Sequence, residues 1–141
     1  MAQKLQTATP ITIASVSQEM TSRKVRVAGR VLAHNTEASL LLLADGDAAL
    51  FVDISLCLSP FKSAPWLQEI NTPVLALGYI EESPNPLPLP TLPLHAPSAT
   101  KVDPYLVLKA LLVTEAPDLD LAMWNHAIEE RRKCALESHA L

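Results

Sequence analysis

The sequence predicts a mainly β domain of five strands followed by one C-terminal α-helix. Segments of alternating or continuous apolar residues recur along the chain, separated by Gly, Asp and Pro turns. A stretch with 3.6-residue periodicity follows the last of them. The 141 residues are 49% hydrophobic and 18% charged, which suits a single domain with a real core. We expect a flexible N-terminus at 1–9 and one domain at 10–141.

The first strong strand covers 23–34. Its valines alternate with basic residues (Lys24, Arg26 and Arg30), a pattern typical of a strand with one buried face. Gly29 in its middle predicts a bulge or a sharp bend. Residues 10–16 alternate weakly and predict an additional edge strand.

Three further strands are expected at 38–44, 48–56 and 73–81. Asp45-Gly46-Asp47 predicts a hairpin turn between the first two, because glycine accepts positive φ. The region 57–71 is interpreted as an apolar plug, apart from Cys57, which is expected to pack in a strand. The plug side chains are Phe61, Trp66, Leu67 and Ile70. Gly78 predicts a bend in the strand at 73–81.

The segment 83–104 holds seven prolines and is expected to form a long polyproline-like surface loop. A fifth strand is predicted at 105–114. The final helix is predicted at 118–137, with Asp118 accepting amide protons as its N-cap or in its first turn.

Five strands, an element between the third and the fourth, and a terminal helix give the order of an OB-fold barrel. Small SH3-like barrels are the main competitor, but they usually lack both the plug and a long terminal helix. The fold class predicted is therefore a five-stranded OB-fold barrel with a C-terminal helix.

The residues that enzymes use are scarce. The four histidines do not pair at metal-ligand spacing, and there is no phosphate loop, GxSxG or HExxH. Asp53 is a strand carboxylate that we expect to hold a backbone amide or a partner's basic group. Cys57 and Cys134 form no CxxC, which makes a disulfide framework or a zinc site improbable. The sequence predicts no catalytic residue, metal or cofactor.

Compartment and partners follow from composition. A chain with no apolar run long enough for a bilayer and no signal-like start is expected to be soluble, in the cytosol or nucleus. The formal net charge of −4 argues against binding nucleic acid by charge over the whole surface. Any nucleic-acid contact must then be a local patch or be shared with a partner.

The terminal helix is the stronger candidate for binding. Its stripe either packs under its own barrel or pairs with a matching helix of a partner, and the high apolar content favours pairing. The stripe that would meet a partner holds Leu121, Trp124 and Ile128, with Ala127 and Arg131 beside them.

A basic stripe on the first strand is the candidate for nucleic-acid contact. Its residues are Lys24, Arg26 and Arg30, and a solvated strand face explains them equally well. Tyr79 and Tyr105 are the two tyrosines that could stack on bases. Aromatic residues make up only 4% of the chain, so tight autonomous binding of single strands is not expected.

The segment VLKALLVTEAPDLDLAMWNHAIEERRK resembles the last strand and helix of the smallest subunit of the telomeric CST complex, the Ten subunit. Upstream, KVRVAGRV, VDISLCL and VLALGYI are similar to that family's first, third and fourth strands. The loop at 83–104 departs from the shorter connection expected of the family.

The resemblance implies a non-catalytic OB-fold subunit that binds the Stn subunit, with the large CST subunit as a second candidate partner. It implies telomere capping in the nucleus and assistance to single-stranded DNA binding. Lys109 and Arg132 join Arg26 and Arg30 as implied DNA contacts. The alternatives are the small subunit of replication protein A, the RecQ-associated OB partner, or a scaffold without DNA contact.

Overall fold

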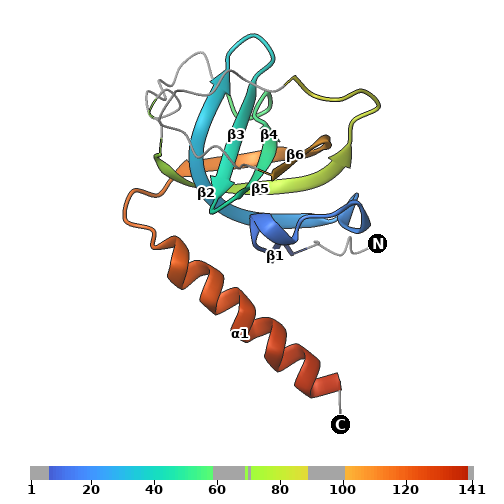
Figure 1. The fold of residues 1–141 in the computed structure, drawn as a ribbon, viewed down its shortest axis with the longest axis vertical. Coiled ribbons are helices and arrows are strands. Elements are labelled where there is room, and N and C mark those ends of the chain that lie inside the picture. The colour runs from blue at the N-terminus through green and yellow to red at the C-terminus, as the bar shows by residue number, and fades with distance from the viewer. Residues whose placement is uncertain (1–6, 59–68, 70, 89–100, 140–141) are drawn as a thin grey trace, which may run out of the picture.

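The computed structural model describes residues 7–58, 69, 71–88 and 101–139, and it is a closed β-barrel with a projecting helix (Figure 1). Its strands are β1 (Thr9–Pro10), β2 (Lys24–Asn35), β3 (Leu40–Asp45), β4 (Ala48–Asp53), β5 (Pro73–Glu82) and β6 (Lys101–Glu115). The sheet order is β1-β2-β3-β4-β6-β5, and pairing of β2 with β5 closes the barrel. The five-stranded OB-fold with a C-terminal helix is confirmed, with β1 as an extra strand.

The long strand β2 belongs to both sides of the barrel. It pairs with β5 through residues 24–30 and with β3 through residues 30–35. Gly29 stands just before this change of partner, where a Cβ would lie 2.6 Å from the Ile13 Cδ1 atom. The register irregularity falls between Val31 and Ala33, not at Gly29. The predicted bulge was therefore misplaced, and Gly29 instead permits a close approach.

The β3–β4 hairpin has the predicted glycine, since Gly46 adopts φ +64°. Strand β4 ends at Asp53, three residues earlier than expected. The Asp53 carboxylate accepts a hydrogen bond from the Ser55 N–H at 2.9 Å, which turns the chain out of the sheet. Cys57 consequently lies after the strand and not in it, and its S–H donates to the carbonyl of Ala110 at 3.5 Å.

The expected edge strand at 10–16 was largely wrong. Only Thr9 and Pro10 pair with β2, in parallel. The chain then forms the 3₁₀ turns η1 (Ile13–Ser15) and η2 (Gln18–Met20), which place Ile13 in the core at 3% exposure. The Ser15 hydroxyl donates to the Thr12 carbonyl at 2.8 Å and favours the turn over a strand. The expected flexible N-terminus lies outside the described residues for 1–6.

The proline-rich segment is shorter than expected, because β6 already begins at Lys101. Lys101 and Val102 pair with β4, and the register shifts directly afterwards. Pro104 lies in that irregular stretch, where its missing N–H is not required and its carbonyl accepts from the Leu87 N–H at 2.8 Å. Residues 89–100 of the loop lie outside the described residues, as do the four plug side chains Phe61, Trp66, Leu67 and Ile70.

Helix α1 spans Leu121–His139, so it begins three residues later and ends two residues later than predicted. The cap is Asp120 and not Asp118: its side chain accepts from the Met123 N–H at 3.2 Å, and its carbonyl accepts from the Trp124 N–H.

Apolar residues pack on both sides of the β3–β4 wall. The barrel interior holds the main core, including Val27, Leu41 and Leu108, each fully buried. A second cluster covers the outer face of β3 and β4. Its members are Leu32, Leu40, Leu42, Ala44, Ala49 and Phe51.

Candidate functional site

The first turns of α1 attach it to the outside of the barrel beside β2. Leu121 is buried at 7% exposure, and the Asn125 side-chain amide donates to the Asp45 carboxylate at 2.5 Å. Beyond these turns the helix extends away from the barrel (Figure 1). Leu121 is thus largely used within the chain, which leaves little of it for a partner.

Trp124 is held by a strand residue. The guanidinium carbon of Arg26 lies 5.9 Å from the centroid of the Trp124 ring, a cation–π distance. The indole remains half-buried, and its Nε1 atom is buried without a hydrogen-bond partner among the residues described. Arg26 and Trp124 were assigned to different predicted surfaces, and the structure brings them into one contact.

The other predicted helix residues are accessible. Ala127 and Arg131 are exposed, and Ile128 is half-buried. Ile128, Arg131 and Arg132 line a groove of about 480 Å³ between the helix and the segment 9–20. Met20 and Ile11 from that segment give the groove an apolar side, and Glu19 and Glu129 give it acidic groups beside the two arginines.

Three leucines missed by the sequence analysis form an apolar strip on the barrel. Leu77 of β5 pairs with Leu112 of β6 on one side and with Arg26 of β2 on the other. Gly78 pairs with Ala110, so Leu111 is the extra residue of a bulge. Leu111 and Leu112 are 45% and 55% exposed. The run Ala110-Leu111-Leu112 breaks the alternation of β6, and this break was the available sequence signal.

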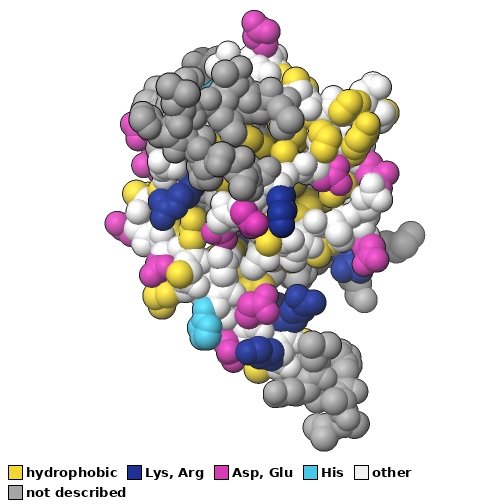
Figure 2. All heavy atoms as spheres, in the orientation of Figure 1, with side chains coloured by type: hydrophobic (Ala, Val, Ile, Leu, Met, Phe, Trp, Pro, Cys, Tyr) yellow, Lys and Arg dark blue, Asp and Glu magenta, His cyan; other side chains and the backbone are white. Residues whose placement is uncertain are grey.

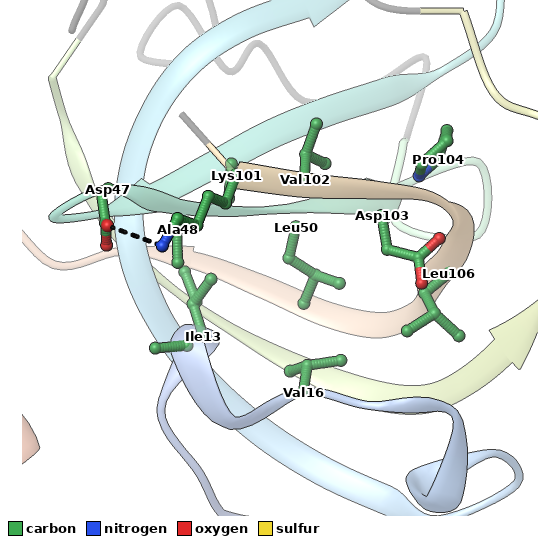
Figure 3. Close-up of a pocket in the computed structure, with 12 residues that line it drawn as sticks. Ile13, Val16, Asp47, Ala48, Leu50, Lys101, Val102, Asp103, Pro104 and Leu106 are labelled. Atoms are coloured by element: carbon green, nitrogen blue, oxygen red, sulfur yellow. Dashed lines mark ion pairs between the residues drawn. The ribbon is translucent and has the colours of Figure 1, made fainter. Parts of the chain in front are cut away.

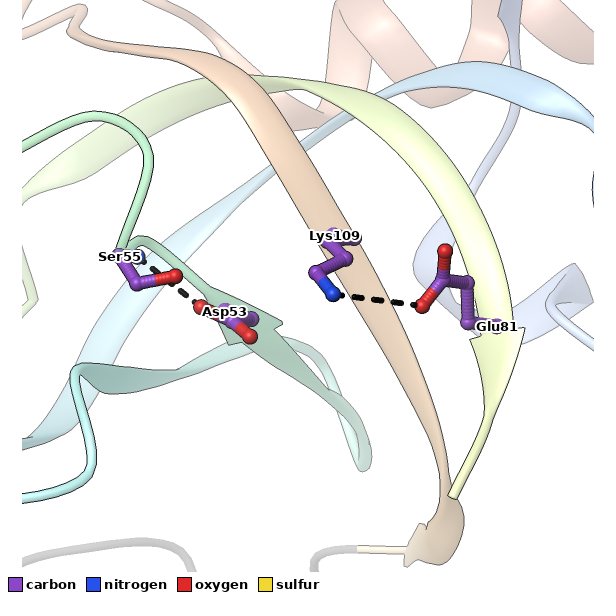
Figure 4. Close-up of polar contacts among 4 residues, drawn as sticks. All are labelled: Asp53, Ser55, Glu81 and Lys109. Atoms are coloured by element: carbon purple, nitrogen blue, oxygen red, sulfur yellow. Dashed lines mark hydrogen bonds and ion pairs between the residues drawn. The ribbon is translucent and has the colours of Figure 1, made fainter.

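Three predicted nucleic-acid residues fall in one row across the outer face. Lys24 of β2 lies opposite Tyr79 of β5, and Tyr79 lies opposite Lys109 of β6. Lys109 also pairs with Asp53 of β4. Figure 4 shows Lys109 reaching Glu81 at 3.8 Å, while Asp53 holds Ser55 as the structural interpretation predicted.

The remaining predicted nucleic-acid residues are dispersed. Arg30 lies at the other end of the β2–β5 pairing, where its Nη1 donates to the Asn71 carbonyl at 3.3 Å. Tyr105 is 45% exposed in the irregular part of β6, and Arg132 is on the helix. Figure 2 shows basic and acidic side chains interspersed on one face of the molecule, with no continuous basic track in that view.

The largest cavity among the pockets described, about 760 Å³, lies between η1, the start of β4 and the start of β6 (Figure 3). Ile13, Val16, Leu50 and Leu106 make it apolar, and the exposed ion pair of Lys101 with Asp47, at 3.6 Å, stands at its rim. Within the described ranges, no group of three His, Cys, Asp or Glu side chains is placed to hold a metal ion. No helix in that part of the chain is long and apolar enough to cross a membrane.

A closed five-stranded barrel, a helix that leaves it after a short attachment, and an exposed apolar strip on β5 and β6 define a small OB-fold binding subunit. The family model described as "Telomere-capping, CST complex subunit" matches residues 5–138. The chain belongs to this family. Comparison with curated protein sequences finds no match.

Solved structures share the fold. The telomere capping protein Ten1 from S. pombe is 19% identical with a TM-score of 0.62, covering 91% of this chain and 100% of that one. A chain of the S. pombe Stn1–Ten1 complex is 18% identical with a TM-score of 0.60, covering 91% of this chain and 94% of that one. Asparaginyl-tRNA synthetase from Entamoeba histolytica is 12% identical with a TM-score of 0.58, but the match covers 84% of this chain and only 26% of that one.

Proposed function

We propose that the chain is a non-catalytic subunit that caps telomeres by forming a heterodimer with an Stn-type OB-fold subunit. The family match over residues 5–138 supports telomere capping within a CST complex. The S. pombe relative occurs in a Stn1–Ten1 complex, which supports the choice of partner. The large CST subunit is a second partner, and the site of action is the chromosome end in the nucleus.

The proposed partner surface, which we name the corner surface, comprises Leu77, Leu111, Leu112, Trp124 and Ala127. Trp124 is linked to Leu112 through Arg26 and Leu77, which are neighbours across adjacent strands. Strand spacing is about 4.8 Å, so the exposed leucines start within about 10 Å of Arg26. Two leucines about half exposed and a half-buried tryptophan linked to them through Arg26 give the apolar centre that stable interfaces have.

The single observation that carries the interface is this exposed leucine pair on β6. An isolated domain gains nothing by exposing Leu111 and Leu112, whereas a partner that covers them gains about 25 cal/mol for each Å² of apolar surface buried. Ile128 and Arg131, on the adjoining groove, extend the surface along the helix. An interface of standard size buries about 1,600 Å² in total.

The test is a titration of the full chain with its Stn-type partner. Trp124→Ala is expected to weaken the heterodimer by about 2 kcal/mol, roughly 30-fold in Kd. His126→Ala is the matched control, because His126 is exposed on the same helix two residues away and lies outside the corner surface. Leu112→Asp is expected to weaken the heterodimer at least as strongly. Unchanged affinity for both Trp124→Ala and Leu112→Asp would refute the interface.

The proposal includes assistance to single-stranded DNA binding by the assembled complex. Arg26 and Arg30 lie on β2, and charge reversal at both positions, at a partner concentration that keeps the heterodimer formed, tests whether these two residues contribute. A lower DNA affinity and a weaker salt dependence are expected if they do. An unaltered affinity with an unaltered salt dependence would make Arg26 and Arg30 part of a solvated strand face.

A further inference from the structure

We propose that single-stranded nucleic acid crosses this barrel on the outer face of β2, β5 and β6, over Lys24, Tyr79 and Lys109. OB-folds commonly bind oligonucleotides elsewhere, on the face that here belongs to β3 and β4. The inference rests on the proposed role in single-strand binding and specifies the path. Two independent observations carry it: the usual face is closed, and a basic–aromatic row stands on another.

The outer face of β3 and β4 is an internal packing surface. Leu40, Leu42 and Phe51 are 7%, 2% and 2% exposed, although their neighbours along each strand point into the barrel. Leu87, Val102 and Val107 pack against them. Among the described residues of this cluster, a base has no exposed ring to stack on and a phosphate has no cation to pair with.

Backbone hydrogen bonds fix the residues that close this face. The Leu87 N–H donates to the Pro104 carbonyl at 2.8 Å, and the Ser83 N–H donates to the Tyr105 carbonyl at 2.8 Å. The Asp103 carboxylate in turn accepts from the Tyr105 N–H at 2.9 Å. The start of the proline-rich loop is therefore attached to the irregular part of β6, and opening the face would break both hydrogen bonds that join them.

The boundary of the closed face runs along β6. Val107 belongs to the packed cluster, whereas Lys109, the next residue on the same side of the strand, is exposed. From Lys109 the row continues through Tyr79 to Lys24. Adjacent strands are about 4.8 Å apart, so the backbones of the two lysines are about 10 Å apart, with half-buried Tyr79 at the register position between them. Two ammonium groups for phosphates and one ring for a base match what a short single strand presents.

Acidic side chains beside this row reduce the attraction of its lysines for phosphate. Glu81 pairs with Lys109 at 3.8 Å, and both side chains are close to half exposed (Figure 4). Such an exposed ion pair is weak, so an incoming phosphate can replace the carboxylate. Asp53, at the end of the row, is engaged with the Ser55 N–H. Removing the Glu81 charge should therefore strengthen nucleic-acid binding.

The experiment measures binding of a short fluorescein-labelled oligothymidylate to the heterodimer of the full chain with its Stn-type partner. Lys24→Gln with Lys109→Gln is expected to lower affinity about tenfold and to reduce the salt slope by about 1.4, the value for two phosphate contacts on a single strand. Glu81→Gln is expected to raise affinity about threefold. Tyr79→Leu is expected to lower it about fivefold by loss of stacking.

The matched control is Thr36→Glu with Ala38→Glu. Both residues are exposed on the β2–β3 turn, at the edge of the face that OB-folds commonly use. Each double variant lowers the formal net charge from −4 by two units. The control is expected to keep the original affinity. Equal losses in the two double variants would indicate a general charge effect, and a larger loss in the control would indicate the β3–β4 face; either result overturns the proposed path.

The heterodimer Kd and the melting temperature are measured on the same samples. If the heterodimer forms and neither lysine nor glutamate substitution alters oligothymidylate binding, the path is wrong while the capping heterodimer stands. If no heterodimer forms with the unaltered chain, the proposed function itself fails. Photo-crosslinking with a 4-thiothymidine strand gives a second measurement: an adduct on the peptide containing Tyr79 supports the path, and one confined to the β3–β4 peptide overturns it.

Discussion

The guanidinium of Arg26 lies over the ring of Trp124, with its central carbon 5.9 Å from the ring centroid. A strand residue and a helix residue that were assigned to nucleic acid and to a partner are thus in contact with each other. Arg26 contacts the indole and is the cross-strand neighbour of Leu77, so we expect it to act as a positioning residue for the corner surface. We therefore expect loss of the Arg26 charge to leave the Trp124 side chain less firmly positioned.

Arg26→Ala is therefore expected to weaken the heterodimer about twofold to fivefold, in line with a cation–π contact of roughly 0.5–1 kcal/mol. The measurement is the Kd for the Stn-type partner by titration calorimetry. Arg26→Lys should retain part of the effect, because the ammonium still faces the ring. Arg30→Ala is the control, since Arg30 contacts the Asn71 carbonyl and not the helix. An effect of Arg30→Ala equal to that of Arg26→Ala would assign the loss to general charge.

The hydrogen bond between Asn125 and Asp45 is expected to set the stability with which α1 is attached. It joins an amide to a carboxylate at 2.5 Å and is partly buried, so it belongs to the stronger class of hydrogen bonds. Asn125→Ala and Asp45→Ala should each lower the free energy of unfolding by about 1–2 kcal/mol, and the double variant should cost less than the sum. Urea unfolding of the four proteins measures this coupling. Strict additivity would show that the two side chains act independently.

The local sequence pattern predicted those elements whose structure depends mainly on their own residues. The alternation in β2 and β5 and the glycine turn at Gly46 have local causes, and the structure has them where expected. Pro104 was assigned to a loop because proline cannot donate to a ladder. Its place in β6 depends on the register shift against β4 and on Leu87, and neither is visible in the local sequence.

The start of α1 and the corner surface also depend on tertiary contacts that the local sequence does not reveal. Asp118 and Asp120 flank Leu119 and are equally good caps in isolation. The cap at Asp120 matches a helix that begins with Leu121 buried on the barrel and Asn125 bonded to Asp45. The exposure of Leu111 results from its bulge opposite Gly78, a property of the β5–β6 pairing.

Gly78→Ala is expected to destabilise the barrel severely. A Cβ at this position would lie 2.0 Å from the carbonyl oxygen of Lys109 and 2.8 Å from the Ala110 Cα, both backbone atoms of β6. The strands would have to separate at the bulge, at a cost of about 3 kcal/mol. Gly46→Ala is the comparison, since nothing lies within 4 Å of its Cβ and only the strain of φ +64° is added, about 1 kcal/mol. Thermal melting that finds the Gly46 variant the weaker of the two would contradict the close approach.

The two cysteines are expected to report on the partner surface by their rates of alkylation. Cys134 is exposed and follows Ala127 and Arg131 on one stripe of α1. Cys57 is half-buried, and burial, with a smaller contribution from the charge of Asp53, raises the pKa of its thiol. Because the thiolate is the nucleophile, iodoacetamide at pH 8 should modify Cys134 about tenfold faster than Cys57, and the Cys57 rate should rise as pH increases.

Formation of the heterodimer should then slow alkylation of Cys134 at least fivefold and leave the Cys57 rate unchanged, because a partner on the Ala127 and Arg131 stripe covers the neighbouring thiol. Mass spectrometry of the two tryptic peptides at successive times measures both rates in one sample, with Cys57 as the internal control. A Cys134 rate that is the same in the free chain and the heterodimer would confine the partner to the first turns of α1. The second half of α1 would then face solvent or a different partner.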